Sequence, residues 1–397
     1  MPKQTVRDIE VSGRKVLVRV DFNVPRTETG EVSDDRRIRG AIPTLKNILD
    51  RGGSLILVSH LGRPTGDPAA DAPFRTDAPA ARLASLLGKN VVKVGDTVGP
   101  EAVAACARLA PGGIVMLENV RFNKGEKKGD VEFAKKMASL ADCYVNDAFG
   151  TCHRDEASMV AVPEQFPPEK RAIGFLVEKE LEILATLLGA PKHPYIAVMG
   201  GAKVSDKIGV IENLVKKVDR LLIGGAMTYT FLSAMGHSIG KSKVESDKLE
   251  MARALMQSAG DKLVLPSDHL VARAPEAGAE TKVVVGPDIP DGWFGMDIGP
   301  RAAAEYDALI QAAAVVIWNG PMGKFETEDF AAGTKAVAQS LARSPAITAV
   351  GGGESAEAIE KFGLADKVSH VSTGGGAFLE SLEGKRFNSL AVIPDKA

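Results

Sequence analysis

The fold is decided by the stretch Ile196-Ala-Val-Met-Gly-Gly-Ala-Lys203-Val-Ser-Asp-Lys207, where strand-forming residues end in a glycine pair that opens a helix. The pattern recurs three times in the second half of the chain, as Leu221-Leu-Ile-Gly-Gly-Ala-Met, Ala349-Val-Gly-Gly-Gly-Glu354-Ser-Ala and Val371-Ser-Thr-Gly-Gly-Gly-Ala-Phe. A strand followed by a tight turn and a helix is the unit of parallel α/β sheets. Ligands of such sheets bind at the carboxyl ends of the strands, so these turns are candidate binding positions.

Strand-like and helix-like runs alternate along almost the whole chain, which predicts βα units and mostly parallel sheets. Many of the strand-like runs carry Val, Ile and Leu at consecutive positions, as strands buried on both faces do. The expected strands are Lys15–Val20, Ser54–Ser59, Ile114–Leu117, Cys143–Asn146, Tyr195–Met199, Arg220–Ile223, Val315–Trp318 and Ala346–Val350.

The glycine turns of the second half favour a site for a nucleotide. Backbone N–H groups at the start of a helix have no helical partner and lie at the positive end of the helix dipole. Glycine lets a phosphate approach them closely. Lys203 and Lys207 follow Gly200 and Gly201 and lie one helical turn apart on the same face, which indicates phosphate contact rather than a solvated surface.

The matching strand ends of the first half carry charged and polar side chains. They read Val18-Arg-Val-Asp21-Phe-Asn23-Val-Pro, Val58-Ser-His60-Leu-Gly-Arg63-Pro, Leu117-Glu-Asn-Val-Arg121-Phe and Val145-Asn-Asp-Ala-Phe-Gly-Thr-Cys-His-Arg154. Together with Arg37, these arginines and His60 predict a basic basin for a small anion, held by forked bonds. Asp21 and Asn23 lie on one side of the first strand and are suited to a substrate hydroxyl; the alternative is that Asp21 pairs with one of the arginines.

The composition excludes several classes of protein. The 397 residues suggest two or three domains, and 45% hydrophobic and 25% charged residues are ordinary for a globular protein. The net charge of −2 gives no support to a nucleic-acid-binding or membrane surface. No apolar run reaches the ~18 residues of a membrane span, and the first residues do not resemble a signal peptide, so a cytoplasmic location is expected.

The three cysteines, Cys106, Cys143 and Cys152, are scattered and form no CxxC pair, which argues against disulfides and a zinc site. Cys152 and His153 are adjacent, and neighbouring residues rarely face each other as nucleophile and base. We expect both to have structural roles.

One segment in the middle of the chain differs from the βα pattern. From Val177 to Leu188 the apolar residues have helical spacing, and Gly189 and Pro191 then end the helix. A helix between two series of βα units is a natural rigid connector, which places the domain boundary near it.

Two negative observations narrow the chemistry. No G-x-G-x-x-G follows the first strand, and Gly236-His-Ser-Ile-Gly-Lys241-Ser has one residue too few between its glycines for a P-loop, so we expect a loop there.

No residue stands out as a general base either. A kinase that phosphorylates an alcohol needs one, whereas a carboxylate acceptor has no proton to remove. Catalysis would then depend on charge neutralisation and alignment.

Together these segments resemble the phosphoglycerate kinase family, and the resemblance covers essentially the whole chain. The segments that carry it are Arg19-Val-Asp-Phe-Asn-Val-Pro25, Ser59-His-Leu-Gly-Arg-Pro64, Leu117-Glu-Asn-Val-Arg-Phe122, Asn146-Asp-Ala-Phe-Gly-Thr-Cys-His-Arg154, Gly200-Gly-Ala-Lys-Val-Ser-Asp-Lys207, Trp318-Asn-Gly-Pro-Met-Gly-Lys-Phe-Glu326 and Ser372-Thr-Gly-Gly-Gly376.

The resemblance implies two doubly wound parallel-sheet (Rossmann-like) domains joined by a helix, with an active-site cleft between them. The expected limits are 1–172 for the 3-phosphoglycerate domain, 173–190 for the helix and 191–379 for the nucleotide domain, with the tail 380–397 returning to the first. The implied reaction is reversible phosphoryl transfer from 1,3-bisphosphoglycerate to MgADP in glycolysis and gluconeogenesis. Transfer would be in line, after domain closure, by a monomer that needs Mg²⁺ with its ATP or ADP.

Carried over residue by residue, the resemblance implies three sets of site residues. The 3-phosphoglycerate set is Asp21, Asn23, Arg37, His60, Leu61, Gly62, Arg63, Arg121 and Arg154. The nucleotide set is Lys203, Lys207, Gly224, Gly225, Gly295, Glu326, Gly352, Gly353, Glu354 and Ser355, with Glu354 also on the metal. The set at the transferring phosphoryl group is Arg37, Lys203, Gly374, Gly375 and Gly376.

Two positions need comment. The family usually has Asp where this chain has Glu354, which is one methylene longer, so its metal contact is direct, bridged by water, or lost. Arg36 and Arg37 adjoin, and Arg37 is chosen because the family's substrate arginine directly precedes the isoleucine; Arg36 is the alternative.

Two rival functions share parts of these patterns. A nicotinamide dehydrogenase has the same α/β alternation, but the missing glycine fingerprint disfavours it. A non-catalytic two-domain nucleotide sensor would keep the glycine turns and would have no need of the first-half arginines.

Overall fold

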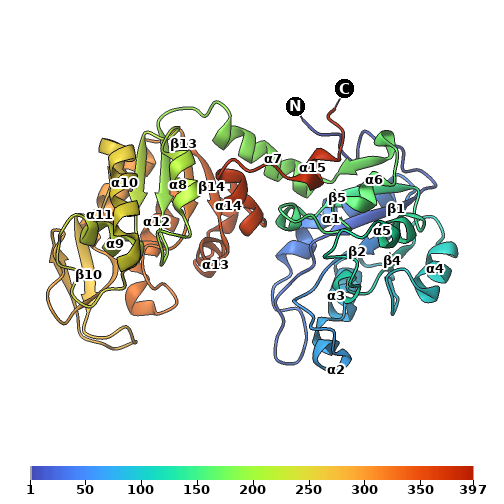
Figure 1. Ribbon diagram of the computed structural model, residues 1–397, viewed down its shortest axis with the longest axis horizontal. Coiled ribbons are helices and arrows are strands. Elements are labelled where there is room, and N and C mark those ends of the chain that lie inside the picture. The colour runs from blue at the N-terminus through green and yellow to red at the C-terminus, as the bar shows by residue number, and fades with distance from the viewer. Residues whose placement is uncertain (1, 397) are drawn as a thin grey trace. The chain divides into compact units, whose positions relative to one another are not determined.

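The computed structural model describes residues 2–396 and divides into two compact units. Unit 1 contains the residues up to Glu182 and those from Arg386 onward, and unit 2 runs from Ile183 to Lys385. The division falls inside helix α7 (Phe175–Leu188), and the limits predicted from the sequence lie on either side of that helix. In each unit a twisted sheet is covered by helices (Figure 1).

The sheet of unit 1 is parallel throughout and has the strand order β3-β4-β2-β1-β5-β6. Its strands are β1 (Lys15–Val20), β2 (Ser54–Val58), β3 (Val92–Lys93), β4 (Ile114–Met116), β5 (Cys143–Asp147) and β6 (Arg171–Ile173). The helices are α1 (Arg36–Asp50), α2 (Pro68–Asp71), α3 (Asp77–Leu87), α4 (Pro100–Ala107), α5 (Val131–Ala138), α6 (Ala161–Glu164) and α15 (Asn388–Ala391).

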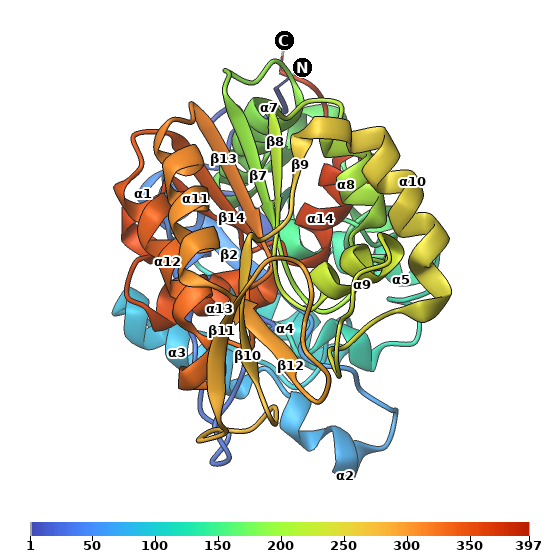
Figure 2. The same ribbon diagram turned by 90° about the vertical axis from the view of Figure 1, so that its left-hand side faces the viewer.

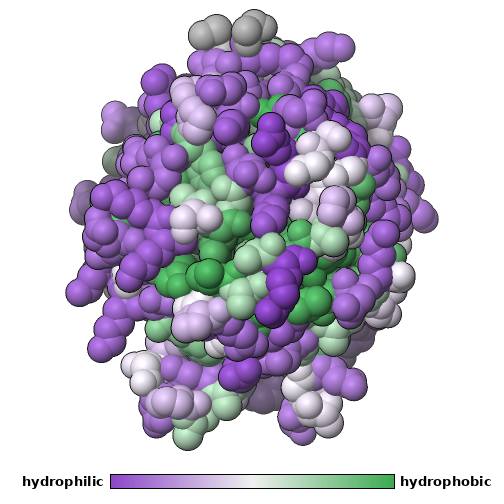
Figure 3. Space-filling model, turned by 90° about the vertical axis from the view of Figure 1, so that its right-hand side faces the viewer, coloured by the Kyte–Doolittle hydropathy of each residue, from purple (hydrophilic) through white to green (hydrophobic). Residues whose placement is uncertain are grey.

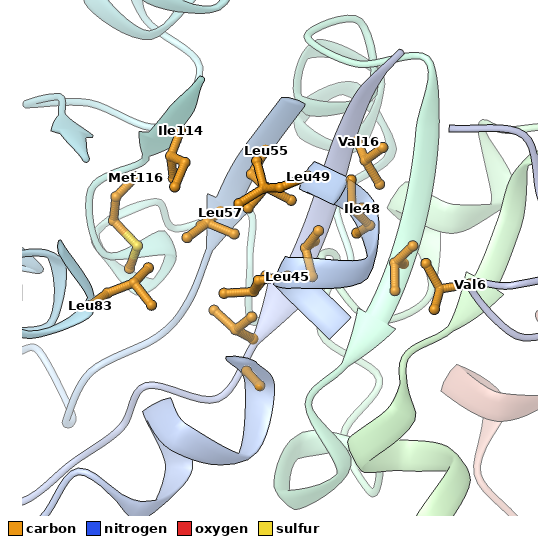
Figure 4. Close-up of a cluster of buried hydrophobic side chains, with 14 of the residues drawn as sticks. Val6, Val16, Leu45, Ile48, Leu49, Leu55, Leu57, Leu83, Ile114 and Met116 are labelled. Carbon is orange, nitrogen blue, oxygen red and sulfur yellow. The ribbon is translucent and has the colours of Figure 1, made fainter. Parts of the chain in front are cut away.

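One core of unit 1 lies between this sheet and helices α1 and α3 (Figure 4). Leu45 and Ile48 of α1 and Leu83 of α3 pack against Leu55 and Leu57 of β2, and all five side chains are fully buried. Strands β1 and β2 are buried on both faces, which explains the consecutive apolar residues Val16–Val18 and Leu55–Val58.

The surface of unit 1 shows hydrophobic residues toward the middle of one face, with hydrophilic residues around them (Figure 3). Among the residues of this unit that the structure describes, the exposed large hydrophobic side chains are those of Val92, Val103, Phe122 and Val131. The two ends of the described chain meet on unit 1, where Lys3 pairs with Asp395 in an antiparallel bridge.

The sheet of unit 2 is also parallel, with the order β15-β14-β13-β7-β8-β9. Its strands are β7 (Tyr195–Met199), β8 (Arg220–Ile223), β9 (Leu263–Val264), β13 (Val315–Asn319), β14 (Ile347–Gly351) and β15 (His370–Val371). The helices are α8 (Ile208–Leu214), α9 (Met227–Ala234), α10 (Leu249–Ala259), α11 (Pro300–Gln311), α12 (Ala332–Arg343), α13 (Gly353–Lys361) and α14 (Gly376–Leu382). Helices α11 and α12 cover one face, and α8 and α10 lie on the other (Figure 2).

The predicted doubly wound parallel sheets are therefore confirmed, but unit 2 contains a second sheet that the sequence did not predict. It is antiparallel, with the order β11-β10-β12, and consists of β10 (Asp268–Ala272), β11 (Thr281–Val285) and β12 (Phe294–Ile298). The segment Gly236–Lys241, expected to be a loop, is a loop.

The first residues of α7 are fixed from two other elements of unit 1. Phe175 N donates to Thr44 Oγ1 of α1 at 2.8 Å, and Leu176 N donates to Asp147 Oδ1 at the end of β5 at 3.0 Å. These side chains accept from N–H groups that have no partner inside the helix. The connector helix thus starts from the same strand end and the same helix that carry predicted site residues.

Candidate active site

Four strands of unit 1 end at the same edge of its sheet, because neighbouring strands run parallel. Asp21 follows β1, His60 follows β2, and Arg121 follows β4. Arg154 lies beyond β5, after a short 3₁₀ turn, and Arg37 belongs to the first turn of α1. The edge therefore gathers most of the residues predicted for the small anion.

Arg37 pairs with Asp21, the outcome left open as the alternative to a substrate contact. Its Nη1 atom lies 2.9 Å from Asp21 Oδ2 and also donates to Asn23 O at 3.2 Å. Burial alone would raise the pKa of Asp21, but the positive charges of Arg37 and Arg19 hold it below its ordinary value. The Asp21 carboxylate therefore stays ionised and orients Arg37.

Asn23 is likewise bonded within the protein, since its Oδ1 accepts from Gly62 N at 2.9 Å. Gly62 has φ +63°, and a Cβ there would lie 2.2 Å from the ring of Phe74, so only glycine fits this turn. A hollow of about 480 Å³ lies beside Asn23, Leu61 and Gly62.

The other arginines differ in their surroundings. Arg121 is almost fully buried; its Nη2 lies 2.7 Å from Glu156 Oε1, and its Nη1 donates to Gly62 O at 3.0 Å. Arg63 and Arg154 are exposed. The predicted basin thus contains two arginines already paired with carboxylates, Arg37 and Arg121, and two that are open to solvent.

Sequence reasoning missed one residue of this edge. Arg19 is fully buried on β1, and its Nη2 lies 3.2 Å from His60 Nδ1. Arg19 stands two residues before Asp21 in the quoted motif. Residues two apart on a strand lie on the same face, and this spacing was the one signal that could have placed Arg19 beside Asp21.

In unit 2 the turns after β7, β8, β13, β14 and β15 also meet at one sheet edge. Lys203 and Lys207 lie in the turn after β7, while Gly224 and Gly225 lie in the turn after β8. The segments 352–355 and 374–376 form the starts of α13 and α14. Gly295 is on β12 of the second sheet, and Glu326 is exposed in the loop that follows β13.

The glycine pairs have a different role from the bare backbone that the sequence suggested. Gly200 N donates to Asn319 O and Gly201 N to Pro321 O, both at 2.9 Å, while Gly225 N donates to Met322 O at 2.8 Å. A Cβ on Gly225 would lie 2.5 Å from the backbone of Gly201. These glycines let neighbouring turns pack backbone against backbone, so their N–H groups already have partners.

Lys207 lies at the centre of this edge. Its Nζ donates to the Oδ1 atom of Asn319, and Asn319 Nδ2 donates to Gly351 O at 2.6 Å. Burial lowers the pKa of Lys207, while Glu354 and Asp206 act in the opposite direction. Lys203 is exposed. Asn319 is buried and was not predicted as a site residue, although it stands in the quoted Trp318-Asn-Gly-Pro motif.

A second residue that the sequence analysis missed fixes the turn between the two lysines. Glu245 Oε2 accepts from Val204 N at 2.6 Å and from Ser205 N at 3.1 Å, and Glu245 Oε1 accepts from Ser205 Oγ at 2.5 Å. No pattern near Glu245 signals this contact, because 40 residues separate it from Ser205.

The start of α13 is suited to a magnesium ion that arrives with a nucleotide. Glu354 is exposed in the first turn of this helix, and Ser355 Oγ accepts from Gly320 N at 2.5 Å. Within residues 2–396 no group of three or more His, Cys, Asp or Glu side chains is placed to hold a metal. Mg²⁺ is usually bound by one or two carboxylates together with substrate phosphates, so a single carboxylate here fits it.

No helix within residues 2–396 has the length and apolar character needed to cross a membrane.

Comparison with known proteins gives one consistent result. The family model described as phosphoglycerate kinase matches residues 6–385. A phosphoglycerate kinase of Rhodopirellula baltica is 51% identical over 397 residues, which is 100% of both chains. One of Rubrobacter xylanophilus is 51% identical over 396 residues, 100% of this chain and 99% of the relative.

Solved structures agree. The phosphoglycerate kinase of Coxiella burnetii is similar with a TM-score of 0.87 and 38% identity, and 98% of each chain is covered. That of Pyrococcus horikoshii has a TM-score of 0.85 at 30% identity, with the same coverage. With a family model over nearly its whole length and relatives at half identity, this chain belongs to the phosphoglycerate kinase family.

Proposed function

We propose that the chain transfers a phosphoryl group between 1,3-bisphosphoglycerate and MgADP, with the acidic metabolite bound by unit 1 and the nucleotide by unit 2. The observation that carries this assignment is the contrast between the two sheet edges. One gathers three arginines that follow β2, β4 and β5, with Arg37 at the start of α1, and the other gathers the two lysines that follow β7 and the starts of α13 and α14. Forked guanidinium groups suit the phosphate and carboxylate of a small acid, and helix starts suit a phosphate chain.

The proposed contacts of 3-phosphoglycerate follow from the state of each side chain. Arg63 and Arg154 are exposed, so their charges are open to a ligand that arrives from solvent. Arg37 and Arg121 are held in place by Asp21 and Glu156, so their donors are oriented before the ligand arrives. Orientation before binding reduces the entropy lost when the ligand binds.

Lys203, Lys207 and the start of α13 are the proposed contacts of the nucleotide phosphates. Lys207 is held by Asn319, whereas the exposed Lys203 is free to follow the phosphoryl group in flight. Glu354 is the proposed magnesium ligand, and the metal would supply charge neutralisation between phosphate oxygens. We propose that Gly224, Gly225 and Gly295 border the adenine base and that Glu326 binds the ribose.

The reaction requires the protein to position the reactants and to neutralise charge, and it requires no general base. The acceptor of the reverse reaction is a carboxylate, which carries no proton that a base must remove. Arg37, Lys203 and the N–H groups at the start of α14 are proposed to share the charge that develops on the transferring group.

A coupled assay with MgATP and 3-phosphoglycerate tests the function, with Lys203→Ala as the variant and Lys216→Ala as the control. Lys216 is an exposed lysine of the same unit outside the proposed site. Turnover should fall about 10²–10³-fold in Lys203→Ala and stay unchanged in the control. Nucleotide binding without any turnover in the wild type would instead favour a nucleotide sensor.

Transfer in line requires that the reacting groups carried by the two units meet. We therefore expect small-angle scattering to show a smaller radius of gyration with both ligands than with either alone. A radius that does not change would contradict closure. The same samples would test the proposed monomeric state.

A further inference from the structure

We infer that His60 meets its ligand as a neutral imidazole that carries its proton on Nε2, and that Arg19 is the positioning residue that imposes this tautomer. The inference deepens the proposed function and rests on it for the identity of the ligand. It changes the nature of the basin, because His60 then contributes a directed hydrogen bond and no positive charge.

Arg19 is fully buried, and each arm of its guanidinium group has a partner. Nε donates to Ser158 Oγ at 2.8 Å, Nη1 donates to Val20 O at 2.5 Å, and Nη2 lies 3.2 Å from His60 Nδ1. Three contacts from a fork of fixed geometry hold the group in one orientation.

The direction of the bond between Arg19 and His60 follows from the chemistry of the guanidinium group, which has donors and no acceptor. Nδ1 of His60 must therefore accept. A histidine ring that accepts at Nδ1 is neutral and carries its proton on Nε2. Nε2–H is thus the donor left for a ligand.

A buried carboxylate on the other side of Arg19 supports its charge. Glu126 is fully buried; its Oε1 lies 2.5 Å from Ser158 Oγ, and its Oε2 accepts from Ser158 N at 2.9 Å. Because Ser158 Oγ accepts from Arg19, its own proton is available for Glu126. Burial of the guanidinium group without a nearby opposite charge would be strongly unfavourable.

The other charged groups near His60 have opposing effects on its pKa. Asp21 Oδ1 lies 3.9 Å from Nδ1, too far for a hydrogen bond, and Asp21 is already paired with Arg37. Arg121 and Arg37 oppose a charged ring together with Arg19, and His60 itself is buried. Burial first, and then these arginines, place the pKa of His60 well below its ordinary value, whereas Asp21 acts against them.

Nuclear magnetic resonance of the ligand-free full-length chain, with ¹⁵N-labelled histidine, tests the tautomer directly. The six histidines can be distinguished by comparison with a His60→Gln sample. We expect His60 to show a protonated Nε2, an unprotonated Nδ1 and no titration in the range where an ordinary histidine titrates. A proton on Nδ1, or a cationic ring at pH 7, would overturn the inference.

The role of Arg19 is tested by the double variant Arg19→Met/Glu126→Gln, which removes both buried charges so that neither is left unpaired. His60 should then titrate. KM for 3-phosphoglycerate should rise about fivefold and become dependent on pH, while KM for MgATP and kcat change less. A merely structural contribution of Arg19 would not move the ¹⁵N signals of the ring.

A folded double variant whose His60 keeps its Nε2 proton and whose KM for 3-phosphoglycerate is unchanged would refute the role of Arg19. If the variant does not fold, the spectrum of the wild type still decides the tautomer. An inactive wild type with the expected spectrum would refute the proposed function and leave the tautomer standing.

Discussion

The Nη1 atom of Arg37 lies 2.9 Å from Oδ2 of Asp21, whereas the guanidinium group of its neighbour Arg36 contacts Asp34. Two adjacent arginines on one helix thus have different environments. Arg37 is oriented toward the strand ends of the sheet by a buried carboxylate, and Arg36 is tied to a half-exposed one.

The first prediction follows from this difference. Arg37→Ala should lower kcat about 10²–10³-fold, because it removes an oriented charge from the site. Arg36→Ala is the matched control and should change kcat by no more than about twofold. Steady-state kinetics with 3-phosphoglycerate measure kcat for both variants. A large loss of kcat in Arg36→Ala with a small loss in Arg37→Ala would reverse the assignment.

The second prediction concerns Glu245, which holds the turn between Lys203 and Lys207. Glu245→Gln replaces a carboxylate that accepts two backbone N–H groups and a hydroxyl. Hydrogen bonds to a charged group contribute about 1.5–3 kcal/mol each, so KM for MgATP should rise about tenfold. Glu250→Gln, on the exposed surface of α10, is the control. Equal KM values for the two variants would show that the turn holds its shape unaided.

The third prediction concerns Glu354. Because its carboxylate is exposed at the start of α13, Glu354→Gln should increase the Mg²⁺ concentration at half-maximal rate by roughly tenfold. Glu354→Asp keeps the charge and should keep turnover within a few-fold. Titration of activity with Mg²⁺ at fixed nucleotide provides the measurement. A Glu354→Gln enzyme with the wild-type Mg²⁺ requirement would exclude a metal contact.

The fourth prediction is a pH dependence of stability. Asp147 ends β5 and accepts from the start of α7, and burial raises its pKa from 3.8 to about 7, while bonds from Thr44, Leu176 and the next backbone N–H act against the shift. The folded state therefore binds a proton that the unfolded state has lost between about pH 4 and pH 7. Stability should fall across this window, by at most about 1.4 kcal/mol per pH unit.

Asp147→Asn removes this titration without changing the size of the side chain. Urea unfolding of both proteins from pH 5 to pH 8 should show the variant gaining stability relative to the wild type as the pH rises. A difference between the two proteins that does not change with pH would mean that Asp147 is already ionised in the folded chain.

Much of the fold could be predicted because it depends on local pattern. The strands Lys15–Val20, Tyr195–Met199 and Arg220–Ile223 have the predicted bounds, since runs of apolar residues between turns suit strands buried on both faces. The antiparallel sheet was missed because its strand Thr281–Val285 is largely exposed, so its valines do not mark a strand buried on both faces.

The sequence by itself determined that most of the predicted site residues reach the two sheet edges, because they follow strands and parallel strands end together. Only the tertiary structure decided how they are held. Ser158 lies 139 residues from Arg19, and Glu156 lies 35 residues from Arg121, so no local spacing could reveal these contacts. It also decided that the glycine N–H groups after β7 and β8 are used between turns. Strand ends are set by local propensity, whereas hydrogen-bond partners are set by which strands become neighbours in the sheet.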